Sequence, residues 1–303
     1  MNSTSAITNS QSQSHTRNLA NKLMATSAIT SPAAPAATLP LAGRVAIVTG
    51  ASRGIGRGIA THLSSLGASL VLGYASSSQQ ADALAAELPR AVAVKADVSD
   101  EAGVRSLFDA AESAFGGAAH ILVACAGLGI GTYPSLANTS TADFDNVFAV
   151  NTRGAFLCLR EAANRLRRGG GGRIVAVSST LAATLLPGYA AYAASKAAVE
   201  AMVRVAAKEL GSARVTVNCV APGPVATELF FDGKSEEAVE RFRAGHPMGR
   251  LGEVGDIAPA VGFLCTDAAE WVNGQAILDE ARRHGAAASA SEAPRRERGR
   301  ATS

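Results

Sequence analysis

Short apolar runs alternate with longer amphipathic stretches along most of the chain. The runs are rich in Val, Ile and Ala with few polar positions, which is typical of strands buried on both faces of a parallel sheet. We expect strands at residues 44–49, 68–73, 91–95, 120–124, 173–178 and 214–220. Helical periodicity between them predicts helices at residues 57–66, 77–88, 99–115, 141–150, 151–168 and about 192–210. Ser99 is the expected N-cap of the third helix.

This strict alternation predicts an α/β fold. A single Rossmann-type, doubly wound parallel sheet should carry helices on both faces, joined by right-handed crossovers. No linker interrupts the pattern, so residues 41–277 are expected to form one domain.

The first forty residues have a different composition. They are rich in Ser, Thr, Ala and Asn and contain no acidic residue, which suits a disordered leader or an organellar transit peptide equally. Arg17 is their only arginine, and Met24 offers a second start. We therefore expect a cytoplasmic protein, with the chloroplast as the alternative if residues 1–40 act as a transit peptide.

The other end of the chain is also unusual. After Ile277 the sequence continues Leu278-Asp279-Glu280 and becomes rich in Ala and Arg. Such a composition does not favour a buried edge strand. Residues 278–303 are therefore expected to form a disordered tail.

Composition and charge exclude several function classes. Apolar residues make up 48% of the chain and no run of eighteen apolar residues occurs, so no membrane span is expected. The net charge of +3 comes from the two ends, since residues 44–280 carry 20 basic and 23 acidic side chains. A mildly acidic core lacks the positive surface that binds the phosphates of nucleic acids, so a nucleic-acid partner is not expected. The four cysteines and five histidines lack ligand spacing, so no disulfide frame or metal site is predicted.

A glycine-rich turn follows the first predicted strand. Gly50, Gly54 and Gly56 are spaced G-x-x-x-G-x-G and precede a helix. Glycines let the backbone approach a pyrophosphate, and the free N–H groups of a helix N-terminus bind anions. A tight turn without a ligand is the alternative. The turn therefore predicts a dinucleotide site that also includes Ser52, Arg53 and Ile55.

A second motif places a tyrosine and a lysine on the same face of a predicted helix. Tyr192 and Lys196 are four residues apart on a predicted helix, so their side chains emerge on one face, and Ser179 lies thirteen residues upstream of Tyr192. A neighbouring cation favours the phenolate and makes a tyrosine a usable acid or base. Taken alone, the pair also fits an exposed amphipathic helix.

Together these motifs resemble the short-chain dehydrogenase/reductase family over about residues 41–277. Within it, the chain resembles plant NADPH-dependent aldehyde reductases and 3-oxoacyl reductases. The resemblance implies catalytic roles for Ser179, Tyr192, Lys196 and Asn151, with Ser179 and Tyr192 binding the substrate. It implies further cofactor contacts at Asp97, Val98, Ala126, Gly127, Asn151, Tyr192, Lys196, Pro222, Gly223, Val225 and Thr227.

One departure concerns the fourth strand. The family's Asn-Asn-Ala-Gly is replaced by Ala124-Cys125-Ala126-Gly127, so side chains that usually tie neighbouring strands are missing. The positions of the other expected site residues agree with the resemblance. A predicted strand comes just before each of Gly50, Asp97, Ser179 and Pro222, and ligands of parallel sheets bind at the carboxyl ends of the strands.

The second strand indicates which cofactor is bound. In NAD-binding relatives an acidic residue at the end of the second strand binds the hydroxyl groups of the adenosine ribose. Here the corresponding segment, Gly73-Tyr74-Ala75-Ser76-Ser77, has no carboxylate. Arg53 offers a planar fork to a 2′-phosphate, and Tyr74, Ser76 and Ser77 complete this side of the site. A solvated arginine beside a serine-rich loop is the alternative. We expect NADP(H).

The predicted function is NADPH-dependent reduction of a neutral aldehyde or ketone. The pocket is expected to be apolar and without a fixed cation, lined by residues 128–133, Leu185, Leu186 and residues 228–248, with residues 228–245 as a mobile lid. The alternatives are a low-turnover NADP(H)-binding sensor and an alcohol dehydrogenase working oxidatively. The resemblance also implies a homo-tetramer or homo-dimer.

Overall fold

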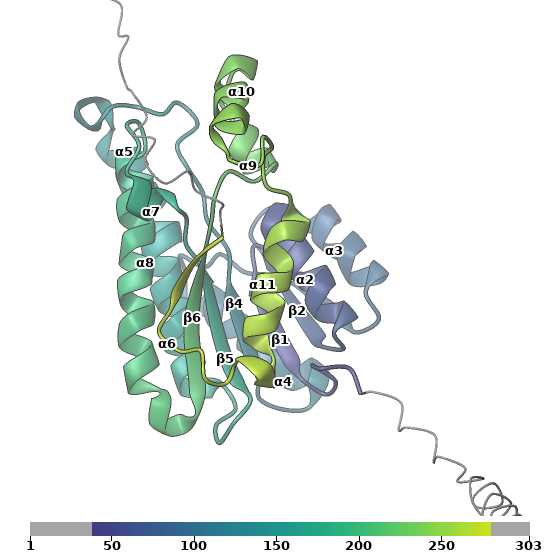
Figure 1. The fold of residues 1–303 in the computed structure, drawn as a ribbon. Coiled ribbons are helices and arrows are strands. Elements are labelled where there is room, and N and C mark those ends of the chain that lie inside the picture. The colour runs from purple at the N-terminus through teal and green to yellow at the C-terminus, as the bar shows by residue number, and fades with distance from the viewer. Residues whose placement is uncertain (1–37, 280–303) are drawn as a thin grey trace, which may run out of the picture. The chain divides into compact units, whose positions relative to one another are not determined.

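The computed structural model describes residues 38–279. Seven strands form one parallel sheet in the order β3-β2-β1-β4-β5-β6-β7 (Figure 1). They are β1 (Val45–Thr49), β2 (Ser69–Tyr74), β3 (Ala91–Lys95), β4 (Ile121–Ala124), β5 (Gly172–Val177), β6 (Val215–Pro222) and β7 (Ala276–Asp279). The strand order reverses between β1 and β4, which is the switch point where doubly wound sheets bind ligands. The predicted fold class is confirmed.

Helices cover both faces of this sheet (Figure 1). On one face, α2 (Gly54–Ser65) and α11 (Val254–Cys265) share a core that includes Ile59, Leu63 and Val261, with α3 (Ser78–Glu87) at its margin. On the other face lie α4 (Glu101–Phe115), α6 (Ala155–Arg165) and α8 (Ala190–Glu209). The central strands are buried on both faces, as their continuous apolar sequences require.

Shorter elements gather around the carboxyl ends of the strands, where α9 and α10 rise above the sheet (Figure 1). They are α5 (Thr141–Val147), the π-helix η2 (Phe148–Gly154), α7 (Leu181–Thr184), α9 (Glu228–Phe231) and α10 (Glu236–Gly245). Three 3₁₀ turns complete the description: η1 (Leu136–Asn138), η3 (Gly211–Ala213) and η4 (Asp267–Ala269).

The expected end of the ordered domain at residue 277 is wrong by two residues. Leu278 and Asp279 continue β7 and pair in parallel with Ala221 and Pro222 of β6. The expectation rested on side-chain burial, but backbone pairing at a sheet edge does not need it, and Leu278 is 44% exposed. The predicted leader at residues 1–40, apart from its last three residues, and the tail from residue 280 lie outside the described residues.

Two local expectations also change. Asp100 caps α4 by accepting the Gly103 N–H, whereas Ser99 donates to the Asp97 carboxylate instead. The missing family asparagines after β4 are compensated by Thr49, whose buried hydroxyl oxygen accepts the N–H groups of both Cys125 and Ala126, at 3.0 and 3.1 Å.

Within residues 38–279, none of the helices combines the length and the apolar character that crossing a bilayer requires.

Candidate active site

The glycine turn between β1 and α2 has the shape of a phosphate cradle. Gly50 and Gly54 adopt positive φ angles of 66° and 52°, which glycine tolerates best. A Cβ on Gly56 would lie 2.1 Å from the Gly50 carbonyl oxygen, so the turn can close this tightly only with glycine there. Arg53, the N-cap residue of α2, does not cap the helix through its side chain. The free N–H groups and dipole of this helix therefore suit a pyrophosphate.

The other expected cofactor residues lie at the same edge of the sheet. Tyr74 ends β2, and Ser77 precedes α3 without capping it through its side chain. Thr227 caps α9 through its hydroxyl oxygen, which accepts the Phe230 N–H at 3.3 Å. Pro222 is the last residue of β6, and Ile55 lies in the first turn of α2. The remaining residues of this set follow the carboxyl ends of strands and are Ser52, Ser76, Asp97, Val98, Ala126, Gly127, Gly223 and Val225.

Arg53 has a partner that the sequence did not indicate. Its Nη1 lies 2.7 Å from Oε2 of Glu228, the first residue of α9, and both side chains are mostly exposed. An exposed ion pair of this kind contributes little free energy. Arg53 can therefore exchange this carboxylate for a phosphate at small cost.

Helix α8 places Tyr192 and Lys196 against the carboxyl end of β5. The Lys196 side chain is buried, and its Nζ donates to the Val177 carbonyl at 2.9 Å. The same nitrogen lies 5.8 Å from the centroid of the Tyr192 ring. Ser179 lies two residues beyond Val177, with its hydroxyl accepting the Leu181 N–H. The structure thus brings these three predicted catalytic residues to the end of one strand.

Asn151 lies in the π-helix η2 and is buried. Its amide bonds the Leu128 backbone in both directions at 2.9 Å, and its Nδ2 also donates to the Ser195 hydroxyl at 3.0 Å. It makes no direct hydrogen bond to Lys196 within the described chain. Both polar groups nevertheless lie 3.2 Å from the point that a Cβ on Gly127 would occupy. Glycine at this position therefore keeps the space between Asn151 and Lys196 open.

Two serines next to predicted catalytic residues fix α8, and sequence reasoning missed the role of both. The Ser178 hydroxyl lies 3.0 Å from the Glu200 carboxylate and 3.3 Å from the Lys196 carbonyl, so its single proton is shared between these two acceptors. Ser195 donates to the Tyr192 carbonyl at 2.7 Å while it accepts from Asn151. A hydroxyl beside a catalytic residue carries no distinctive signal in a single sequence.

The expected lid forms two short helices that pack on the loop at residues 128–133. Its Gly233 has a φ of 68°, and a Cβ there would lie 1.8 Å from the Gly131 carbonyl oxygen. Only glycine permits this approach. The contact places α9 and α10 over the expected substrate pocket, as both elements rise above the strand ends (Figure 1).

The expectation of a pocket wall without a fixed cation is wrong, because Lys234 of this lid lies in the wall. Its half-buried Nζ lies 4.3 Å from the Tyr133 ring centroid and 4.6 Å from that of Phe230, with Tyr189 and Phe242 further out. The nitrogen also donates to the Tyr133 hydroxyl and the Phe230 carbonyl. Burial lowers the pKa of Lys234. The ammonium is engaged within the wall, so it joins the lid to the loop.

Tyr189 connects this aromatic cage to Tyr192, three residues later. Burial raises the pKa of Tyr189 to about 12, and the nearby Tyr133 and Tyr192 add to the effect. Its ring centroid lies 5.1 Å from that of Tyr133. Tyr189 therefore stays a neutral phenol and serves as a wall between the lid and the catalytic edge.

Comparisons with known proteins agree with this geometry. A family model described as Enoyl-(Acyl carrier protein) reductase matches residues 50–279. An NADPH-dependent aldehyde reductase-like protein, chloroplastic, of Arabidopsis thaliana is 56% identical over 79% of this chain and 93% of its own length. The chain belongs to the short-chain dehydrogenase/reductase family. It is therefore an oxidoreductase of this family.

Further relatives support the assignment. NADPH-dependent aldehyde reductase 2, chloroplastic, of Arabidopsis thaliana is 50% identical over 84% of this chain and 97% of its own length. A crystal structure of a short chain dehydrogenase from Burkholderia cenocepacia in complex with NADP has a TM-score of 0.74. It is 34% identical and covers 80% of this chain and 98% of the crystallised chain.

Replacing Lys234 by Met tests the lid contact, because it keeps the apolar stem but removes the ammonium. Cation–π contacts worth about 1–2 kcal/mol would be lost, so we expect KM for a carbonyl substrate to rise about five- to thirtyfold. The Kd for NADPH, measured by fluorescence, should change little. Lys208→Met, an exposed lysine at the end of α8, is the matched control. An unchanged KM in Lys234→Met would show that the cage does not hold the lid.

Proposed function

We propose that the chain reduces neutral aldehydes or ketones to alcohols with NADPH as the hydride donor. The observation that carries the proposal is the convergence of Ser179, Tyr192 and Lys196 at the end of β5. This edge also carries the glycine cradle. A phenol, a hydroxyl and an ammonium beside a dinucleotide site suit proton transfer to a carbonyl oxygen.

The cofactor is NADP(H), as the names of two relatives and the NADP complex of a third support. Glycines of the first turn would hold the pyrophosphate, and Arg53 the 2′-phosphate, with Tyr74, Ser76 and Ser77 beside it. Thr227 and its neighbours at the end of β6 would bind the carboxamide. Lys196 would hold the nicotinamide ribose. When bound, NADPH supplies the hydride for the carbonyl carbon.

The chain's own residues handle the proton. The Ser179 and Tyr192 hydroxyls hydrogen-bond the carbonyl oxygen, and Tyr192 donates its proton as that oxygen gains negative charge. A cavity of about 10 Å³ is lined by both Asn151 and Lys196. That is about the volume that one water needs. A water there would bridge Asn151 and Lys196, and the Lys196 ammonium would pass a proton toward Tyr192 and regain one from that water.

A neutral substrate fits the walls of the site. Lys234 spends its hydrogen bonds on Tyr133 and Phe230, so it offers little to a substrate carboxylate. The Tyr133 ring packs against Tyr189, and the Phe230 ring packs edge-on against Phe242, which gives the walls apolar ring surface. Oxidation of an alcohol by the same groups is the reverse reaction. The ratio of NADPH to NADP⁺ decides which of the two directions prevails. A sensor that binds NADP(H) without turnover is the second candidate.

Tyr192→Phe tests the proton donor. We expect kcat with a panel of aldehydes and ketones to fall about 10²- to 10⁴-fold, because the phenol proton is lost. The Kd for NADPH should remain within a few-fold of wild type. Tyr189→Phe removes a neighbouring phenol and should keep most activity. Wild-type turnover in Tyr192→Phe would exclude the mechanism, and a wild-type protein that binds NADPH but reduces nothing would favour the sensor.

Arg53→Gln tests the cofactor preference. One charged hydrogen bond is worth about 1.5–3 kcal/mol, so the Kd for NADPH should rise about ten- to a hundredfold while that for NADH changes little. Arg57→Gln, which breaks the ion pair with Glu87 one turn along α2, is the matched control. Glu228→Gln should tighten NADPH binding slightly, because it releases Arg53. An equal loss for NADPH and NADH in Arg53→Gln would contradict the assignment.

We place the protein in the chloroplast. Two relatives carry that location in their names, which favours the transit-peptide alternative over the cytoplasmic expectation, for which the relatives give no support. Residues 1–40 fused ahead of a fluorescent reporter should direct it to chloroplasts in plant cells. Diffuse cytoplasmic fluorescence would reject this location.

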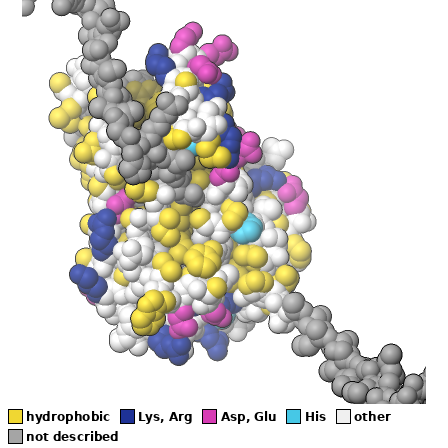
Figure 2. Space-filling view, in the orientation of Figure 1, with side chains coloured by type: hydrophobic (Ala, Val, Ile, Leu, Met, Phe, Trp, Pro, Cys, Tyr) yellow, Lys and Arg dark blue, Asp and Glu magenta, His cyan; other side chains and the backbone are white. Residues whose placement is uncertain are grey.

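We further propose that the chain forms a homo-oligomer through the β7 edge. Apolar side chains gather on this face around β7 and α11 (Figure 2), and Trp271, Phe263 and Leu278 are 97%, 47% and 44% exposed. Exposed apolar surface of this kind commonly marks an interface. Light scattering should give a multimer that Trp271→Glu dissociates, and a monomeric wild type would rule the interface out.

A further inference from the structure

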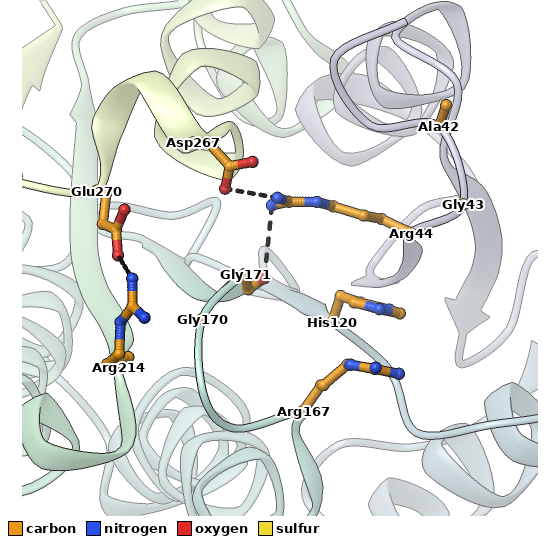
Figure 3. A pocket seen from close by; sticks show the side chains of 10 residues that line it. All are labelled: Ala42, Gly43, Arg44, His120, Arg167, Gly170, Gly171, Arg214, Asp267 and Glu270. Atoms are coloured by element: carbon orange, nitrogen blue, oxygen red, sulfur yellow. Dashed lines mark hydrogen bonds and ion pairs between the residues drawn. The ribbon is translucent and has the colours of Figure 1, made fainter. Parts of the chain in front are cut away.

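A cavity of about 590 Å³ lies at the edge of the sheet opposite the catalytic groups (Figure 3). Its walls come from residues just before four strands. Arg44 precedes β1, His120 precedes β4, Gly171 precedes β5 and Arg214 precedes β6. The catalytic groups follow the carboxyl ends of the sheet. Because the strands are parallel, the cavity and the active site are separated by their length.

Arg44 and Asp267 belong to the inner wall, and Arg173 behind it shares the same carboxylate. Asp267 Oδ1 lies 2.5 Å from Arg44 Nη2 and 3.0 Å from Arg173 Nη2. Arg173 is fully buried, and the Arg44 side chain is only 13% exposed. Burial lowers the pKa of Arg173, and the adjacent Arg44 lowers it further. Incompletely neutralised buried charge is costly, so this wall favours an additional anion.

The outer wall adds more hydrogen-bond donors than acids. Arg214 is already paired with Glu270 at 2.7 Å. Arg167 lines the cavity and forms no ion pair with any carboxylate among residues 38–279. His120 accepts the Val45 N–H through Nδ1, so in its neutral form the proton lies on Nε2, available to a ligand. Figure 3 shows His120 and Arg167 side by side, away from Glu270.

Glycines keep the cavity open between these groups. Gly170 and Gly171 have φ angles of 119° and 81°, a conformation that side chains disfavour. A Cβ on Gly170 would lie 3.6 Å from the Arg214 guanidinium carbon, and one on Gly171 would lie 3.6 Å from that of Arg44. Side chains at these two positions would fill the space in front of both guanidinium groups.

We propose that this cavity binds the phosphate group of a small phosphorylated molecule. Arg44, Arg167 and Arg214 line the cavity, and the buried Arg173 lies behind Asp267. Together with the carboxylates of Asp267 and Glu270 they leave an excess of two positive charges, the charge of a phosphate dianion. Planar guanidinium forks match phosphate oxygens in bidentate geometry. The ligand enters beside Arg167 and His120, where no carboxylate among residues 38–279 holds the guanidinium. Asp267 and Glu270 confine it to that side by repulsion.

Calorimetric titration of the full chain with inorganic pyrophosphate tests the proposal. The titration is done in saturating NADPH at constant ionic strength, so that the cofactor cradle at the other edge is filled. We expect one pyrophosphate per chain. Glycerol 3-phosphate, titrated in the same way, shows whether the phosphate group of an organic ester is also accepted. Binding of pyrophosphate that disappears when NADPH is added would place it in the cofactor cradle and overturn the proposal.

Two variants of equal charge locate the site. Arg167→Gln should weaken pyrophosphate binding about tenfold or more, because it removes a charged hydrogen-bond donor. Arg168→Gln should leave it unchanged, since this exposed side chain bonds the Ala163 carbonyl and does not line the cavity. Glu270→Gln should tighten binding, because it releases Arg214. Equal affinities in the two arginine variants, or weaker binding in Glu270→Gln, would refute the site.

The fold of each variant is checked separately. NADPH fluorescence and thermal unfolding should match wild type in Arg167→Gln, whose exposed side chain takes no part in the buried ion pairs. The measured binding does not depend on turnover. Failure of pyrophosphate to bind a wild type that reduces aldehydes would reject this site alone.

Discussion

The hydrogen bond from the buried Lys196 ammonium to the Val177 carbonyl fixes the geometry of the catalytic edge. Lys196 is only 4% exposed, so its charge requires a partner, and an end carbonyl of β5 supplies one. The bond sets how α8 lies along the sheet and therefore where Tyr192, one turn earlier, meets the strand end. Ser178 reinforces this register by bonding the Lys196 carbonyl.

A parallel sheet gives its two edges different chemistry. At the carboxyl edge, free N–H groups of α2, hydroxyls and a buried ammonium gather where NADP(H) and the proposed carbonyl substrate would bind. The amino edge collects the residues that precede each strand. Four arginines gather there with only two carboxylates, and Arg167 has no ion-pair partner among residues 38–279. Because the strands separate the edges, charge at one can change without disturbing the other.

Sequence patterns predicted the features that depend on local spacing. The strands follow from apolar runs, the cradle from glycine offsets, and the Tyr192–Lys196 pair from helical periodicity. The sequence could not reveal contacts between distant segments, such as Arg53 with Glu228 or Lys234 with Tyr133, since no local pattern encodes them. The strand at Leu278 was missed for another reason. Edge pairing depends on backbone groups, whereas the prediction relied on side-chain polarity.

The π-helix around Asn151 shows how the catalytic edge and the lid are joined. Sequence reasoning placed a boundary between two helices there, but the chain continues through a wider turn, a feature that often marks functional sites. Asn151 uses both atoms of its amide on the Leu128 backbone. Five residues later, Tyr133 bonds Lys234 of the lid. One short loop therefore carries both the contact with Asn151 and the contact with the lid. Asn151 therefore holds the loop in place as well as lining the space beside the ammonium.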